Sequence, residues 1–386
     1  MNKDINNKKP SCYAPWMNTY EWSDGRITPC CEWKFNAPGT IHTKEHMSFE
    51  DRFNHPEMEK TKKQLLEGPI SSIPGCINCV NNEKVGLWSH RDSLNLLVDS
   101  DTFDQSKFKL LHMDYRESNL CNFSCKMCGQ DLSSTHAIIV DAFSDEKLYP
   151  KNGVIKNNQK LQEYLDNLDD VKLEEFLGGE PTLMDSMYII IKEIKKRKLE
   201  SNMDVCLVTN GSVLHRDKDN LLEHLSGFKE INISVSIDVV DDQHNYWRHK
   251  NTWDNVWKNT QLLYKFAQDN DNVILQIRTA LSWPTVFAAR GVFELFKDME
   301  VRHVTNLVTY PQGLNIDQLP KHMLGALCVW WQDYPEIYST FKNTTSMTNM
   351  EILSNEKKRL LHFDKYHGNN FADTFPEFED FYNEIP

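Results

Sequence analysis

Three cysteines with the spacing Cys-x3-Cys-x2-Cys, namely Cys121, Cys125 and Cys128, are the residues whose chemistry is easiest to interpret. Three thiolates on one short loop can hold three irons of a four-iron cluster and leave the fourth iron without a protein ligand. Such an open iron can chelate a small molecule, as a catalytic metal site keeps one position for its substrate. The alternative is zinc or a structural four-cysteine cluster, with a fourth ligand from elsewhere in the chain.

A second set of cysteines lies in the first hundred residues. Its members are Cys12, Cys30, Cys31, Cys76 and Cys79. Gly25 stands five residues before Cys30, so a hairpin carrying Cys30 and a Cys-x2-Cys loop would bring four sulfurs together. Four thiolates saturate either a [4Fe–4S] cluster or a zinc ion, and the spacing leaves both possibilities open.

The elements that position these residues follow from the apolar periodicity. From Lys107 on, short apolar segments alternate with amphipathic ones. We expect strands at 108–115, 172–178, 203–209, 230–238, 272–281 and 303–309, and helices at 131–143, 184–198, 218–226, 253–268 and 285–297. Six such units imply a parallel sheet with right-handed crossovers, either open or curled into a partial barrel.

The fourth expected strand has two different faces. Its alternating residues are Ile231, Ile233, Val235 and Ile237 on one face and Asn232, Ser234, Ser236 and Asp238 on the other. A parallel strand that is buried on both faces is apolar throughout, so the polar face indicates a lined cavity. This favours a barrel-like interior with a ligand at the carboxyl ends of the strands.

Several polar or glycine-rich segments fall on the other strands. The second expected strand ends in Gly178, Gly179, Glu180 and Pro181, and the third ends in Thr209, Asn210 and Gly211. Paired glycines let the backbone approach a ligand closely, and Glu180 offers a carboxylate to an ammonium group. On the fifth strand Gln276 and Arg278 share one face. Arg278 suits a bidentate carboxylate contact, with a surface salt bridge as the alternative.

Together, the cysteine loop, the Gly-Gly-Glu-Pro turn and the polar fourth strand resemble the radical S-adenosylmethionine (SAM) superfamily over about residues 107–310. The resemblance implies a partial (β/α)6 barrel, assigned to 105–312, in which Cys121, Cys125 and Cys128 hold a [4Fe–4S] cluster that binds SAM. Reductive cleavage of SAM would give a 5′-deoxyadenosyl radical that removes hydrogen from a substrate. The implied SAM contacts are Gly178, Gly179, Glu180, Pro181, Thr209, Asn210, Ser234, Ser236, Asp238 and Arg278. Met127 stands where the family often has an aromatic residue.

The cysteine-rich start, assigned to 1–104, resembles the auxiliary-cluster domains called twitch and SPASM, although it precedes the barrel instead of following it. The resemblance implies an auxiliary [4Fe–4S] cluster. Its implied ligands are Cys12, Cys30, Cys76 and Cys79, with Cys31 as the alternative to Cys30. Four ligands would leave no iron open, so this cluster would relay an electron or shape the pocket. The region shows little strand periodicity and one helix, at 49–67, and we do not expect it to build a core without metal.

The last part of the chain, assigned to 313–386, is expected to form a C-terminal helical extension. The candidates for catalytic residues are Cys328, His244 and Tyr310, and the candidates for further substrate contacts are Tyr246 and Arg248. The candidates for peptide docking are Trp283, Trp330 and Trp331, with core packing as the alternative. Cys206 is expected to be buried within its strand.

Composition narrows the class of partner. The formal net charge of −13 argues against a surface built to hold nucleic acid or an anionic membrane. The sequence has no run of 18 apolar residues, and its polar start, 1–10, does not resemble a signal sequence. We therefore expect a cytoplasmic enzyme with an electron donor of the flavodoxin or ferredoxin type. The first substrate hypothesis is a peptide or protein side chain, the second a small metabolite of the nucleotide or sugar type, and the third reading is a non-catalytic iron–sulfur or zinc protein.

Overall fold

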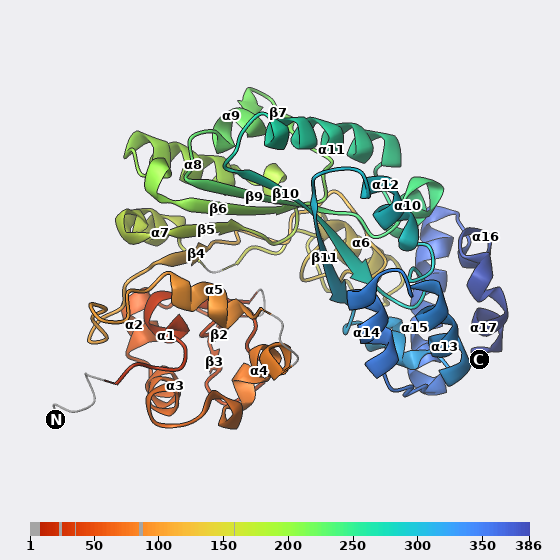
Figure 1. Cartoon of the computed structure of the whole chain (residues 1–386), viewed down its shortest axis with the longest axis horizontal. Coiled ribbons are helices and arrows are strands. Elements are labelled where there is room, and N and C mark those ends of the chain that lie inside the picture. The colour runs from red at the N-terminus through yellow and green to blue at the C-terminus, as the bar shows by residue number, and fades with distance from the viewer. Residues whose placement is uncertain (1–7, 23–24, 35, 85–87, 158) are drawn as a thin grey trace.

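A six-stranded parallel sheet forms the centre of the molecule (Figure 1). The computed structural model describes residues 8–22, 25–34, 36–84, 88–157 and 159–386, so most of the polar start, 1–7, lies outside the described residues. The strands are β4 (His112–Asp114), β5 (Leu173–Phe176), β6 (Asp204–Thr209), β9 (Glu230–Ser236), β10 (Val273–Leu281) and β11 (Arg302–Leu307). Their order, β11-β10-β9-β6-β5-β4, follows the chain, and every neighbouring pair is parallel. The expected α/β class and its six strands are confirmed.

Helices cover one face of this sheet. They are α6 (Ser134–Ala142), α7 (Leu161–Asp166), α8 (Asp185–Lys196), α9 (Leu221–Leu225), α10 (Asp241–Trp247), α11 (Trp253–Gln268) and α12 (Arg290–Phe296), with a two-stranded ribbon of β7 (His215–Arg216) and β8 (Asp219–Asn220). Figure 1 shows α8, α9 and α11 together on one side of the sheet. Met187, Ile190, Ile191 and Ile194 of α8 are buried, and this i, i+3, i+4, i+7 spacing makes one apolar face toward the sheet.

The two faces of the sheet differ as the sequence indicated. Along β10, residues at alternate positions are fully buried, and those between them, including Gln276 and Arg278, are only half-buried. On β9, Ile231, Ile233 and Val235 are buried on the face with the helices. The opposite face, which we call the inner face, carries polar side chains and lies toward the N-terminal region. A half-buried polar face on a parallel sheet is suited to lining a site.

The N-terminal region is a compact helical unit with a small sheet. Its elements are α1 (Ala14–Met17), β1 (Tyr20–Glu21), β2 (Arg26–Thr28), β3 (Ile41–His42), α2 (Phe49–Phe53), α3 (Pro56–Glu67), α4 (Ile77–Lys84) and α5 (His90–Leu96). The single helix expected at 49–67 is in fact two, because Pro56 begins α3 and the residue before a proline disfavours helical backbone. The region also has an apolar core of its own, in which Trp16 and Trp33 supply large buried side chains.

Buried polar and aromatic contacts attach this region to the edge of the large sheet. The backbone N–H groups of Lys109 and Leu111, just before β4, donate to the carbonyls of Trp16 and Met17 at 3.0 and 3.2 Å. The Phe49 ring lies 4.9 Å from that of Tyr164 on α7, measured between centroids. The N-terminal region is therefore held against β4 and faces the inner side of the sheet.

The C-terminal extension is helical, as expected. It consists of α13 (Lys321–Trp330), α14 (Pro335–Asn343), α15 (Met350–His367), α16 (Phe371–Thr374) and α17 (Glu379–Glu384). Trp283 and Trp331 are fully buried beneath these helices and donate to the carbonyls of Gly313 and Val286, so core packing accounts for both. Within the described ranges, no helix is long and apolar enough to cross a membrane.

Candidate functional site

The loop between β4 and α6 carries three thiols in a buried setting. Cys121 and Cys125 are buried and Cys128 is half-buried. The pKa of the Cys125 thiol is raised to about 12, mainly by burial, which outweighs the lowering effect of Arg248. Burial likewise raises the pKa of Cys121, followed by the charges of Cys125 and Glu180. Because such thiols are neutral at pH 7 unless a cation stabilises the thiolate, this donor set fits a metal centre.

The Gly-Gly-Glu-Pro turn after β5 packs directly against this loop. A Cβ atom added to Gly179 would lie 2.2 Å from the carbonyl oxygen of Leu120, which is closer than any side chain can come. The backbone N–H of Glu180 donates to the same carbonyl at 2.7 Å. Only glycine therefore allows the turn to sit beside Cys121, and the close approach serves the cysteine loop itself.

The Glu180 carboxylate joins the ends of the second and third strands. It is buried and accepts hydrogen bonds from the hydroxyls of Thr182 and Thr209 at 2.7 and 2.8 Å, and from the backbone N–H of Asn210 at 2.7 Å. Burial raises its pKa, although each of these donors lowers it. Every one of these partners belongs to the protein, so the predicted contact of Glu180 with a ligand ammonium stays a prediction.

Asn210 connects the third strand to the cysteine loop. Its amide nitrogen donates to Asn122 Oδ1 at 2.9 Å and lies 4.0 Å from the sulfur of Cys121. Asn122 in turn donates to the hydroxyl of Ser212 at 2.9 Å. The carboxyl end of β6 thus contributes an N–H donor to one of the three sulfurs.

Arg248 supplies a charged donor to a second sulfur. Its guanidinium donates to Asp238 at 2.7 Å and approaches the sulfur of Cys125 to 4.0 Å. Asp238 is fully buried, and its other oxygen accepts the backbone N–H of Ala280 at 2.8 Å. Both oxygens of Asp238 are thus engaged within the protein, and its predicted SAM contact stays a prediction. Arg248, expected as a substrate contact, lies instead against the cysteine loop.

Further polar residues line the inner face below the loop. Ser234 donates to Gln276 at 3.0 Å and Gln276 donates to Asn232 at 3.2 Å, so these three form a hydrogen-bonded chain across β9 and β10. Ser236 and Arg278 are paired in register across β9 and β10 and are both half-buried. Among the described residues, the buried Nε atom of Arg278 has no hydrogen-bond partner. A guanidinium with a free donor on this face fits a carboxylate ligand.

A histidine–carboxylate pair on the inner face was not predicted. His112 on β4 lies 2.8 Å from the carboxylate of Glu175 on β5, measured from Nε2 to Oε2. Burial raises the pKa of Glu175, but His112 outweighs it and the net pKa is about 2. Asp114, two residues after His112, is bound by Arg116 at 2.8 and 2.9 Å. His112 and Asp114 are two residues apart on a strand, so their side chains lie on the same face of the sheet. Polar residues at alternate positions of β4 are the sequence signal that would have predicted them.

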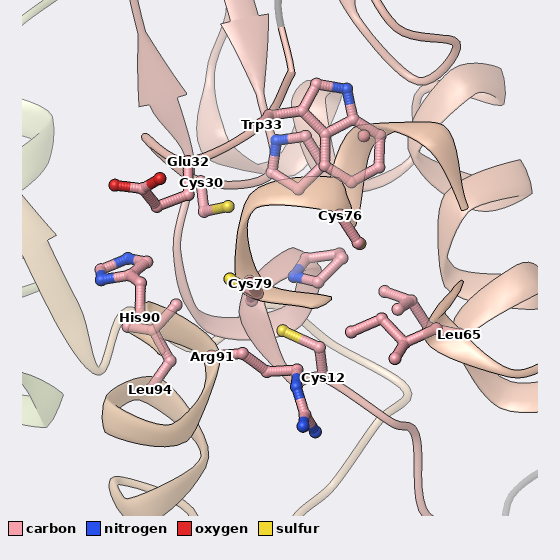
Figure 2. Close-up of a pocket in the computed structure, with 15 residues that line it drawn as sticks. Cys12, Cys30, Glu32, Trp33, Leu65, Cys76, Cys79, His90, Arg91 and Leu94 are labelled. Carbon is pink, nitrogen blue, oxygen red and sulfur yellow. The ribbon is translucent and has the colours of Figure 1, made fainter. Parts of the chain in front are cut away.

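The four cysteines expected to form a second group do surround one pocket. Figure 2 shows Cys12, Cys30, Cys76 and Cys79 around it, and apolar side chains such as Trp33 complete the lining. Burial raises the pKa of Cys12 and of Cys76 to about 12. Within the part of the chain that the structure describes, no three His, Cys, Asp or Glu side chains are arranged to hold a single metal ion.

The hairpin before Cys30 explains how it reaches this pocket. β1 and β2 pair antiparallel, and Gly25 adopts a φ of +86° between them, with the carbonyl of Thr43 only 2.1 Å from where a Cβ would stand. A residue with a side chain would be strained there and would clash. The neighbouring Cys31 is not among the residues that line the pocket, and its sulfur lies 3.7 Å from His90 Nε2. This geometry favours Cys30 over Cys31 as a member of the group.

The three candidates for catalytic residues occupy unlike positions. His244 is fully buried against the ring of Trp253, and burial is the main reason that its pKa falls to about 3. Tyr310 is 81% exposed after β11. Cys328 is half-buried on α13. Their catalytic roles stay predictions, and neither full burial nor full exposure supports a substrate contact for His244 or Tyr310.

The structure also locates three further residues that the sequence singled out: Tyr246, Cys206 and Trp330. Tyr246 is buried and its hydroxyl donates to Asp364 at 2.8 Å, which occupies it within the protein. Cys206 was expected to be buried, but it is only half-buried, because it lies on the half-buried face of β6. Burial is the main reason that its pKa is raised to about 12. Trp330, in contrast to the other two docking candidates, is 45% exposed and lines a shallow groove with Phe287 and Arg290.

Comparison with protein families identifies the domain that carries the site. Residues 117–277 match the radical SAM superfamily. The match contains the cysteine loop, the Gly-Gly-Glu-Pro turn, the sheet strands β5, β6 and β9, and the first part of β10. The match covers less than half of the chain, and it supports an enzyme of the radical SAM kind. No curated protein matches the whole sequence significantly.

Several solved structures are similar at low identity. A structure of native anSMEcpe with bound AdoMet is 18% identical, with a TM-score of 0.37, over 68% of this chain and 62% of that chain. Streptococcus suis SuiB bound to S-adenosylmethionine is 14% identical, with a TM-score of 0.38, over 78% and 54%. TYW1 with a lysine-pyruvate adduct is 13% identical, with a TM-score of 0.30, over 62% and 72%. The chain thus spans about three fifths of the length of the first of these, and likenesses of this size establish neither substrate nor reaction.

Proposed function

Starting from the radical SAM domain at 117–277, we propose that this chain cleaves SAM reductively at a [4Fe–4S] cluster bound by Cys121, Cys125 and Cys128 and removes hydrogen from a substrate. One observation carries the proposal: the ends of β5 and β6 both contact the loop that holds the three thiols. A cluster with one open iron, when bound here, supplies the electron that cleaves SAM to methionine and a 5′-deoxyadenosyl radical.

The chain's own residues prepare this site in three ways. Arg248 and Asn210 direct N–H donors to the sulfurs of Cys125 and Cys121, which stabilises negative charge on them. The burial of the loop excludes water from the thiolates. Arg278, with its unengaged donor on the inner face, is the residue we assign to the SAM carboxylate, with Ser236 beside it.

The four-cysteine pocket is proposed to hold an auxiliary [4Fe–4S] cluster of the twitch or SPASM kind, ligated by Cys12, Cys30, Cys76 and Cys79. The convergence of these four residues on one pocket supports this proposal. Because all four would be ligands, the cluster would carry an electron or shape the site instead of binding substrate. The chain would then divide into an auxiliary region (1–104), a barrel (105–312) and a helical extension (313–386).

A peptide or protein side chain is the proposed substrate. β11 is an edge strand whose Arg302, Thr305 and Asn306 are exposed, so the inner face is open along one edge, where an extended chain has room. The groove beside Trp330, between the start of α12 and the end of α13, offers a separate aromatic contact. A flavodoxin- or ferredoxin-type protein is the proposed electron donor, and the cytoplasm is the proposed location.

Anaerobic reconstitution tests the reaction. We expect about eight irons per chain, and 5′-deoxyadenosine and methionine should form when dithionite and SAM are added. The variant with Cys121, Cys125 and Cys128 all replaced by Ala should keep about four irons and form no 5′-deoxyadenosine. If the wild-type chain binds its full iron and sulfide and still forms none, the proposed reaction is wrong. Zinc in place of iron in the triple variant would refute the auxiliary cluster.

The substrate class has its own test. A substrate should increase the rate of 5′-deoxyadenosine formation, so fractions of host-cell extract that contain proteins, peptides or small molecules can be screened with this readout. We expect the stimulating fraction to lose its effect after digestion with a non-specific peptidase, while a mock digestion leaves it intact. Stimulation that survives digestion would instead favour the small metabolite.

A further inference from the structure

The cysteine loop is also held from the far end of the chain. Ser124 Oγ lies 3.1 Å from His367 Nε2 on α15, and Lys126 Nζ lies 3.0 Å from Asp364 Oδ1 on the same helix. Arg359, one turn earlier on α15, donates to the backbone carbonyl of Lys126. These contacts join residues more than 230 positions apart, and the loop residues that make them alternate with the cluster cysteines.

The Lys126–Asp364 ion pair is enclosed by protein. The Lys126 side chain has 0% of its surface exposed and that of Asp364 has 8%. Asp364 also accepts the Tyr246 hydroxyl at 2.8 Å and the backbone N–H of Phe371 at 3.0 Å. The ammonium lies 4.0 Å from the centroid of the Tyr246 ring. Every charge in this group therefore has a partner.

A buried ion pair of this kind adds little net stability, because removing both charges from water costs about as much as their attraction returns. Its position suggests another role. Lys126 stands between Cys125 and Cys128 in the sequence, so the pair is attached to the segment that carries the thiols. The backbone N–H groups of Ser124 and Lys126, which flank Cys125, donate to the carbonyls of His249 and Trp247 at 3.1 and 2.9 Å. A fixed charge in a dry site acts strongly on any group that changes charge nearby.

We propose that the Lys126–Asp364 pair positions the cysteine loop and sets the reduction potential of the cluster bound there, so that α15 is a functional part of the cluster site. This rests on the proposed function, which places a cluster at this loop. The positive charge of Lys126 favours an added electron on the cluster. The negative charge of Asp364 opposes this effect, and the Tyr246 hydroxyl weakens that opposition by donating a hydrogen bond to Asp364. Lys126 and Asp364 are positioning residues, since neither touches the reacting atoms.

Redox titration followed by EPR tests this proposal on the full chain. The signal that is missing in the Cys121, Cys125 and Cys128 triple alanine variant identifies the loop cluster. Lys126→Met leaves the negative charge of Asp364 and should lower the midpoint potential by about 59 mV, which is a tenfold change for one electron. Asp364→Asn should raise the potential by a similar amount. The double variant, in which both charges are gone, should return close to the wild-type value.

Glu21→Gln is the matched control, because Glu21 and Arg52 form another buried ion pair, 2.6 Å long, in the N-terminal region. It makes the same carboxylate-to-amide change as Asp364→Asn and should leave the potential of the loop cluster unchanged. Tyr246→Phe, which removes one donor to Asp364 without changing charge, should lower the potential by less than Lys126→Met does. It also keeps the proposal testable if the charge variants do not fold.

The outcomes separate the two proposals. A wild-type chain without the loop-cluster signal would overturn the proposed function, and this inference with it. A normal wild-type signal whose potential stays the same in Lys126→Met, Asp364→Asn and Tyr246→Phe would overturn the inference alone. An equal shift in Glu21→Gln would do the same, because the effect would then report general loosening of the fold.

Discussion

The two groups of cysteines differ in number and in surroundings. The barrel loop presents three thiols, with N–H donors of Asn210 and Arg248 close to two of them and the buried Lys126–Asp364 pair holding the same loop. The N-terminal pocket presents four thiols among mainly apolar side chains. Three ligands leave an iron open and four do not, so the first setting suits chemistry and the second suits a closed centre.

Removing one cysteine from each group should produce the largest contrast. Cys125→Ala should lower 5′-deoxyadenosine formation by about 1,000-fold or more, because the open-iron cluster is lost. Cys79→Ala should remove only the auxiliary cluster and reduce uncoupled SAM cleavage by about tenfold at most. Iron analysis and chromatography of the nucleoside measure both effects. Equal loss of SAM cleavage in the two variants would show that the groups do not act separately.

Separate variants of Cys30 and Cys31 test which of the two is a ligand in the N-terminal pocket. Cys30→Ser should lower the iron content by about four per chain, since Cys30 faces the pocket. Cys31→Ser should keep the iron of both clusters, because the Cys31 sulfur is directed to His90. Iron and sulfide analysis of the two neighbouring variants provides the measurement. Loss of iron in Cys31→Ser with retention in Cys30→Ser would reverse the assignment.

Arg248 tests whether polar donors distinguish the barrel loop. Arg248→Met leaves the buried Asp238 carboxylate without its partner, which should lower the free energy of unfolding by about 3–5 kcal/mol. The cluster should also lose iron faster to a chelator. Arg248→Lys keeps the charge but lacks the forked donor, so a smaller loss is expected in both measurements. Denaturant unfolding of the reconstituted protein checks the first value, and a stability equal to wild type in Arg248→Met would contradict it.

The His112–Glu175 pair gives the smallest effect, seen as pH dependence. Burial lowers the pKa of His112, but Glu175 outweighs it and the net pKa is raised, whereas the pKa of Glu175 is lowered to about 2. Because the pKa of His112 is raised in the folded state, the histidine stabilises the fold at pH values below its unfolded-state pKa of about 6.5. This stabilisation is lost as pH rises through the folded-state pKa. Because the pKa of Glu175 is lowered in the folded state, the carboxylate stabilises the fold at pH values above its unfolded-state pKa of about 4.3. This stabilisation is lost as pH falls toward the folded-state pKa of about 2. The stability difference between wild type and His112→Gln should therefore be greatest between about pH 4.3 and 6.5.

Unfolding at several pH values checks this window. Glu175→Gln should show the same dependence, because either change removes the pair. A difference between wild type and His112→Gln that grows from pH 6.5 to pH 9 would contradict the pairing.

Local patterns determined much of the barrel. The alternation along 230–238 predicted a polar inner face, and β9 has it. The helix expected at 253–268 has those bounds in α11. Helix boundaries were predicted less reliably. The helix expected at 285–297 begins only at Arg290, because the residues before it form turns. The single helix at 49–67 missed the break at Pro56.

What the sequence by itself determined was the set of residues with metal-binding chemistry and the parallel sheet that places their loops at one edge, because both follow from spacing and periodicity. The tertiary structure alone decided the partners: Glu180 with the end of β6, Asp238 with Arg248, His112 with Glu175, and Lys126 with Asp364 on α15. Lys126 and Asp364 are 238 positions apart in the sequence. Charge pairing depends on distance in space and on burial, and neither is encoded in a local pattern.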